Sequence, residues 1–151
     1  MMPRLPRYFR LVKPAISRRF RKGGSLLEMV LVMPVLLMLS FGIVDYGYFF
    51  FLKSTIQGAA QAGARASIVS GASNTDVTNA VSAVLTPAGL SSSNYTVTTS
   101  PTTISSAATG TNVTVTITCS WGTVGYHTLP SALGGIPNSK QLTVSSVMRK
   151  E

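Results

Sequence analysis

The hydrophobic pattern changes character along the chain. Residues 29–44 contain no charged side chain, and after Asp45 the apolar run continues for seven more residues. A membrane-crossing helix needs roughly 20 mostly apolar residues, so the pattern predicts one such helix over residues 24–52. Residues 53–69 extend the helical pattern with small side chains, and from about residue 91 apolar and polar positions alternate with a period of two.

The C-terminal part predicts one short helix and three strands. A helix capped by Asn74 or Thr75 and ending near Leu85 would place Val77, Val81 and Val84 on one face. Alternating apolar and threonine positions, clearest in the second of them, predict strands at residues 95–98, 113–119 and 141–147. Three antiparallel strands packed on a helix would bury these faces. We therefore expect an α+β fold, in which a long N-terminal transmembrane or pilin-like helix precedes a small antiparallel sheet.

Three regions follow from this pattern. They are a basic leader at residues 1–23, the transmembrane helix at 24–52, and an exported α+β domain at 53–151 that continues from the helix. Two rows of small residues follow the apolar run, one starting at Gly58 and one at Ala59. Such spacing lets another backbone approach closely. The approaching element is either the chain's own folded part or another subunit.

Charge is concentrated at the N-terminus. Eight of the 13 basic residues lie within the first 22 positions, and residues 23–151 carry five bases and four acids. A basic segment next to an apolar run indicates cytoplasmic retention of that end, so the N-terminus is expected in the cytoplasm and the C-terminal domain outside. Nucleic-acid binding would need the charge on a folded face, and we therefore expect no nucleic-acid partner.

Polar residues within the apolar run require an explanation, because charge there is costly. Glu28 lies about one turn into the run, just after Gly23-Gly24. Cleavage between these glycines would make Glu28 the fifth residue of a mature chain, whose new amine could pair with Glu28 of a neighbouring helix and set the axial register. The simpler alternative is an interfacial carboxylate stabilised by the helix dipole. Asp45, followed by Tyr46 and Tyr48, fits the far membrane interface, where aromatic side chains gather and polar groups reach water.

These motifs together resemble a known family. Glycine, four residues and Glu28, then an apolar helix that contains Pro34 and ends Phe-Gly-Ile-Val-Asp-Tyr-Gly from Phe41 to Gly47, are similar to the TadE/TadG-like pseudopilins of the tight-adherence (Flp-type) pilus system. Within this segment the site residues are Met29, where the tight-adherence pilins proper often have Tyr, together with Pro34, Gly42 and Asp45. The C-terminal Met-Arg-Lys-Glu is similar to the family's terminal Met-Arg-x-Glu.

The resemblance implies a minor pilin-like component in the assembly of a tight-adherence type IV pilus or related secretion machine. It implies a single-pass protein of the bacterial inner membrane whose C-terminal domain is periplasmic or extracellular. The implied partners are other pilin-like subunits, the pilus assembly platform, membrane lipid and a prepilin-type peptidase that cuts at Gly23-Gly24. The alternatives are a plain signal anchor and a membrane-anchored exported binding module that does not enter a filament.

Catalytic chemistry is poorly supported by the sequence. His127 is the only histidine, Cys119 the only cysteine, and Asp76 the only acid between residues 46 and 150. Neither a carboxylate pair nor a Ser-His-Asp set can be assembled from nearby positions. We expect no enzyme activity, no cofactor and no metal site, and we assign no role to Trp121, His127 or Cys119.

Overall fold

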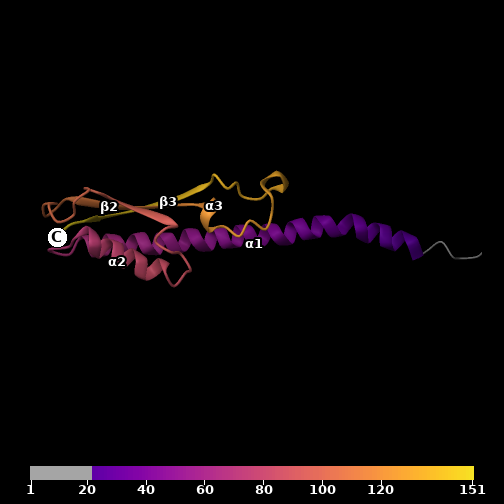
Figure 1. Cartoon of the computed structure of the whole chain (residues 1–151), viewed down its shortest axis with the longest axis horizontal. Coiled ribbons are helices and arrows are strands. Elements are labelled where there is room, and N and C mark those ends of the chain that lie inside the picture. Colours follow the sequence, from indigo (N-terminus) through magenta and orange to yellow (C-terminus); the bar gives the residue numbers. More distant parts are fainter. Residues whose placement is uncertain (1–21) are drawn as a thin grey trace, which may run out of the picture. The chain divides into compact units, whose positions relative to one another are not determined.

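The computed structural model describes residues 22–151, and its first element is a long helix, α1 (Lys22–Ser67) (Figure 1). The helix continues through Pro34 without a break in assignment. Two compact units divide the chain between Val35 and Leu36. The first contributes only the start of α1 to the described structure, and the second, residues 36–151, contains the rest of α1 and all other elements.

The second helix, α2 (Asn74–Leu85), begins with a reciprocal cap. Ser73, and not Asn74 or Thr75 as predicted, is the N-cap residue, and its hydroxyl accepts a hydrogen bond from the Asp76 backbone N–H while the Asp76 carboxylate accepts from the Ser73 backbone. The Asn74 side chain instead bonds to the loop before β2, donating to the Thr102 carbonyl at 2.6 Å and accepting from the Ile104 N–H at 3.0 Å.

The three predicted strands form one antiparallel sheet in the order β1-β2-β3. Their bounds are β1 (Tyr95–Ser100), β2 (Asn112–Ser120) and β3 (Gln141–Arg149). The central strand pairs with β3 over its whole length and with β1 from Thr114 to Cys119, so Ile117 lies opposite Val97 on one side and Val144 on the other. In β2 the apolar positions are buried and the threonines are half-exposed, as the alternation predicted. The expected α+β class is confirmed.

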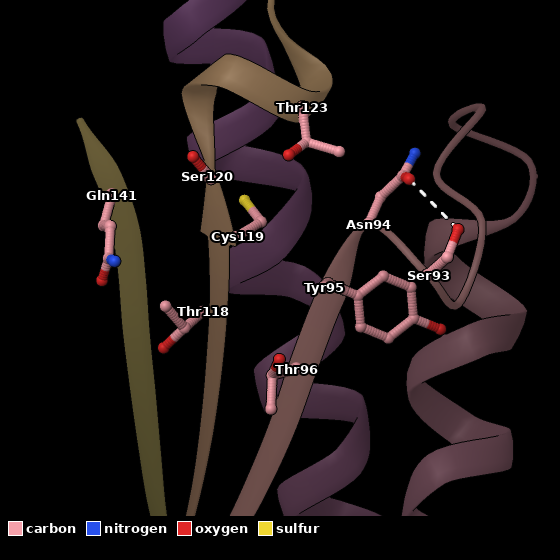
Figure 2. A pocket seen from close by; sticks show the side chains of 9 residues that line it. All are labelled: Ser93, Asn94, Tyr95, Thr96, Thr118, Cys119, Ser120, Thr123 and Gln141. Atoms are coloured by element: carbon pink, nitrogen blue, oxygen red, sulfur yellow. Dashed lines mark hydrogen bonds between the residues drawn. The ribbon is translucent and has the colours of Figure 1, made fainter. Parts of the chain in front are cut away.

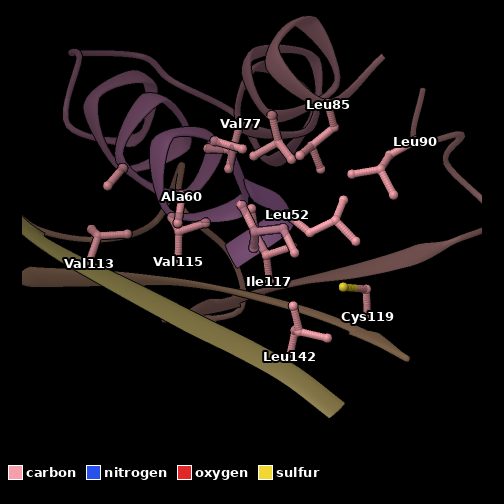
Figure 3. Packing of buried hydrophobic residues seen from close by; sticks show 14 of the residues in the cluster. Leu52, Ala60, Val77, Leu85, Leu90, Val113, Val115, Ile117, Cys119 and Leu142 are labelled. Carbon is pink, nitrogen blue, oxygen red and sulfur yellow. The ribbon is translucent and has the colours of Figure 1, made fainter. Parts of the chain in front are cut away.

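One apolar cluster joins the helices to the sheet (Figure 3). Small residues of α1, the valines of α2 and the alternate residues of β2 meet there, and they include Ala60, Val77, Val81, Val115 and Ile117. The row that contains Ala59 and Gly63 therefore packs on the chain's own folded part, one of the two alternatives from the sequence. The other row begins differently, because Gly58 has open space where a side chain would start.

Two long connections complete the unit. Residues 101–111 lead from β1 to β2, and buried Lys150 donates from its ammonium to the Ile104 carbonyl at 2.7 Å, which fixes this connection to the C-terminus. Between β2 and β3 lie two short elements that the sequence did not predict, the helix α3 (Trp121–Val124) and the 3-10 turn η1 (Ser131–Leu133).

Candidate functional site: the apolar helix and the Asp45 anchor

The apolar start of α1 is uncovered on every side. All 15 large apolar side chains between Leu26 and Val44 are exposed, and none of the most apolar window is buried. Within the described residues α1 is the one helix long and apolar enough, by length and composition, to cross a membrane. A helix that is apolar all round belongs in a lipid bilayer or a protein core, and this one fits a single-pass membrane anchor.

The predicted processing site lies at the start of the described part of α1. The basic leader falls outside the described residues except for its last two positions, Lys22 and Gly23. Gly23-Gly24 is helical and would have to unwind to enter a peptidase as an extended chain. Glycine lowers the helical stability by about 1 kcal/mol per residue relative to alanine, which makes such unwinding easier.

Glu28 projects from the exposed part of α1. Met29 and Pro34 share its exposed surroundings, and Gly42, one turn before Asp45, has open space around its α-carbon.

Asp45 occupies a different environment, where it anchors a loop. We call residues 125–137 the docking loop. The Asp45 carboxylate accepts hydrogen bonds from the Thr128 N–H at 3.2 Å, the Leu129 N–H at 3.0 Å and the Thr128 hydroxyl. The same hydroxyl lies 3.5 Å from the Phe41 carbonyl oxygen, and the Tyr46 hydroxyl is 3.5 Å from the Gly134 carbonyl oxygen.

The expectation that Asp45 reaches water at the membrane interface is therefore wrong for the folded chain. Only 1% of the residue is exposed, and three donors of the docking loop surround its carboxylate. Hydrogen bonds to a charged acceptor are the stronger kind, so a lone acid after an apolar run is compensated without a cation. The sequence signalled Asp45 but contained no signal for its partners, because two of the three donors are backbone groups.

An aromatic cluster supports the same end of the docking loop. Buried Trp121 lies with its ring centroid 5.4 Å from Phe49, 6.1 Å from Tyr48 and 6.1 Å from His127. The indole Nε1 is buried without a hydrogen-bond partner among the described residues. His127 is exposed and has a φ of 49°, a left-handed conformation in which the chain turns into Thr128 and Leu129. This arrangement makes His127 a turn residue.

A cavity of about 250 Å³ lies at one end of the sheet (Figure 2). Hydroxyl and amide side chains predominate in its lining: Ser93, Asn94, Tyr95, Thr96, Thr118, Cys119, Ser120, Thr123 and Gln141. Burial raises the pKa of the Cys119 thiol, which disfavours the reactive thiolate. None of the lining residues is an acid or a histidine. Among residues 22–151 no three His, Cys, Asp or Glu side chains gather in a way that could hold a metal ion.

Comparison with known proteins finds a match to the segment that forms the apolar helix. The family described as TadE-like protein matches residues 23–65, which are the apolar helix and the small-residue turns after it. The chain thus carries a TadE-like N-terminal segment, as the resemblance predicted, and this match suggests a component associated with the tight-adherence pilus. No curated protein and no solved structure matches the chain.

Proposed function

We propose that the protein is a minor pilin-like subunit that takes part in assembling a tight-adherence pilus or a related secretion machine. The observation that carries the proposal is the division of α1, whose first turns are apolar and uncovered while its later turns carry a folded unit. A subunit of this form can remain in the membrane by its helix, or exchange lipid for the helices of other subunits. The TadE-like match covers the same helix.

In this proposal the leader determines orientation and is then removed. The basic residues keep the N-terminus in the cytoplasm, and the domain at residues 53–151 reaches the far side. A prepilin-type peptidase cuts between Gly23 and Gly24. The new amine at Gly24 pairs with Glu28 of a neighbouring subunit, because an unpaired charge among apolar helices is costly. The folded unit, outside the membrane, caps or starts the assembly.

Mass spectrometry of protein from the native membrane tests the processing step. We expect the mature chain to begin at Gly24, without residues 1–23 and their eight positive charges. Gly23→Val should block the cut, because a branched side chain at the cleavage position crowds an extended backbone. Wild-type protein that retains its N-terminal methionine would contradict processing and favour a plain membrane anchor.

Crosslinking to pilin-like partners at matched membrane levels tests Glu28. Glu28→Gln should leave insertion intact, because the neutral side chain is easier to bury. Removing one partner of a buried charge pair costs roughly 3–5 kcal/mol, so association should fall more than a hundredfold. Met29→Leu, at the adjacent position, is the matched control and should associate normally. Loss of only about 0.3–1 kcal/mol would be the result of a dipole interaction alone.

The competing function is an anchored exported binding module that never enters a filament. Fractionation separates the two, because a pilin-like subunit should be recovered with sheared filaments or crosslinked to their base. A reporter that is active only outside the cytoplasm, fused after Glu151, should be active under either function. An inactive reporter there would contradict the orientation.

A further inference from the structure

We propose that the docking loop is a second membrane contact, whose exposed side chains lie in the interfacial layer of the lipid bilayer on the exported side. The proposal uses the membrane-crossing helix but is independent of any pilus role. It assigns a lipid surface as the partner of a loop that lies about 80 residues beyond the apolar run in the sequence.

The length of the apolar helix indicates how deep the docking loop lies in the bilayer. From Leu26 to Asp45 the helix rises about 29 Å at 1.5 Å per residue, which matches the roughly 30 Å of a bilayer's hydrocarbon core. Asp45 therefore lies where hydrocarbon ends. The docking loop bonds to Asp45 and reaches the Phe41 carbonyl one turn closer to the membrane centre. Figure 1 shows this segment, between α3 and β3, running beside α1.

The amino-acid composition of the docking loop favours contact with lipid. No residue from Trp121 to Ser139 is an acid, Lys or Arg. The docking loop turns two apolar residues toward the protein, Leu129 and Ile136, each 8% exposed. It leaves Leu133 51% exposed, so its apolar side chains point both inward and outward. The connection at residues 101–111 differs, because its one large apolar residue, Ile104, is fully buried.

The outer turn of the docking loop pairs several of its own backbone groups, which lowers the cost of bringing this turn close to lipid. The turn at η1 bonds internally, from the Leu133 N–H to the Pro130 carbonyl at 2.9 Å and from the Gly135 N–H to the same carbonyl at 3.1 Å. Pro130 has no N–H to satisfy. The polar groups of Thr128 point toward Asp45.

Aromatic side chains complete the contact. Tyr126 is 69% exposed, and its ring lies edge-on against Tyr48 of α1 at a centroid distance of 4.5 Å. Tyr46, two residues before Tyr48 in α1, is also exposed. Tyrosines gather where hydrocarbon meets water. Tyr46, Tyr48 and Tyr126 lie at about the same depth as Asp45. The docking loop and α1 thus present one continuous surface of interfacial type.

The test uses the full chain in phosphatidylcholine vesicles, with Cys119→Ala to remove the only cysteine. Leu133→Cys is compared with Ser105→Cys, an exposed position in the 101–111 connection. A membrane-impermeant maleimide is added, and each rate is divided by that of the same variant unfolded in detergent. The extent of labelling of Ser105→Cys also gives the fraction of chains whose folded unit faces the outside of the vesicle. Trp121 fluorescence shows that each variant is folded.

We expect Leu133→Cys to react at least about tenfold more slowly than Ser105→Cys, equivalent to about 1.4 kcal/mol. Equal normalised rates would overturn the proposal. Fast reaction in vesicles of the chain alone, with protection only in native membranes, would overturn it as well and would identify a protein partner instead. Neither result depends on whether the chain enters a pilus.

Discussion

The two halves of α1 differ in the exposure of their apolar side chains. In the membrane half, residues 24–44, the apolar side chains are large and exposed on all sides. In the domain half, residues 45–67, Phe50 and Phe51 are still exposed, and from Leu52 onward the helix is two-sided. Leu52 and Ile56 are buried with the small residues after them, while a polar stripe at four-residue spacing is exposed: Lys53, Gln57, Gln61 and Arg65.

This difference shows that one continuous helix can be built for two solvents. A helix facing water needs a polar stripe, and one surrounded by lipid must not have one. The transition begins at Asp45, where the docking loop supplies hydrogen-bond donors to the first acid after the apolar run, and is complete at buried Leu52. The domain half then uses alanine and glycine, because α2 and β2 approach its backbone closely.

The largest expected effect is at Gly63 in the domain half. A side chain there would begin 2.8 Å from a methyl group of Val81 and 3.3 Å from one of Val77. Gly63→Leu should therefore separate α1 from α2 and lower the free energy of unfolding by about 3 kcal/mol, the upper end for overpacked cores. Denaturant unfolding followed by the fluorescence of Trp121, the only tryptophan, measures the change.

Gly58→Leu is the matched control for this change. Gly58 lies on the same helix, but nothing occupies the space where its side chain would start. The isolated chain should tolerate leucine at Gly58. Equal destabilisation by both substitutions would mean that α1 is sensitive to bulk in general, and the distinction between its faces would be lost.

The next effect tests the boundary between the halves. Asp45→Ala removes the acceptor of three hydrogen bonds and leaves the N–H groups of Thr128 and Leu129 without it. We expect a loss of about 2–3 kcal/mol, because unsatisfied donors cost about 1–3 kcal/mol each when buried and Thr128 is partly solvated. Hydrogen exchange should accelerate in the docking loop first. Asp45→Asn keeps one acceptor oxygen and should show a smaller effect.

Much of the fold could be predicted from the sequence, because local pattern determines it. The unbroken apolar run specified α1, and the alternation of valine and threonine specified β2 and its inward face. Ser73, and not Asn74 or Thr75, caps α2, because its hydroxyl and the Asp76 carboxylate form a reciprocal cap. Asn74, a good capping residue by type, bonds to residues 28 and 30 positions away, which no local rule reveals.

The candidate site was less accessible to sequence reasoning. Asp45 stood out as an acid after an apolar run, but Thr128 lies 83 residues away and binds partly through its backbone. Glu28 stood out in the same way, and the single chain places it on the exposed start of α1. The partner proposed for it belongs to another chain, so a single chain brings nothing to it.

A smaller effect concerns α2, which covers only the domain half. Ser73→Ala removes the hydroxyl that caps the Asp76 N–H and should cost about 1 kcal/mol. The loss should appear in unfolding of the folded unit, residues 36–151. Membrane insertion should be unchanged, because the membrane half makes no use of α2. Reduced insertion would show that the two halves are coupled.

The same cap predicts an acid response. Hydrogen bonds from the Ser73 N–H and hydroxyl lower the pKa of Asp76 below its usual value of about 3.9. A lowered folded-state pKa contributes stability that is complete above the unfolded value and is lost as pH falls through the folded value. Wild-type α2 should therefore loosen below about pH 4 more than Asp76→Asn does. Hydrogen exchange of α2 at two acidic pH values measures this difference.

The smallest effect has the opposite sign. Gly58→Ala places a methyl group in open space in the middle of a helix, where alanine is favoured over glycine by about 0.5 kcal/mol or slightly more. The folded unit should gain that amount in denaturant unfolding. Gly47→Ala, also in open space, should behave alike. A gain in the isolated chain combined with weaker crosslinking to partners would mean that the row beginning at Gly58 faces another subunit. A gain without any loss of association would leave that row facing water, and the polar stripe of the domain half would then extend around the whole uncovered side of the helix.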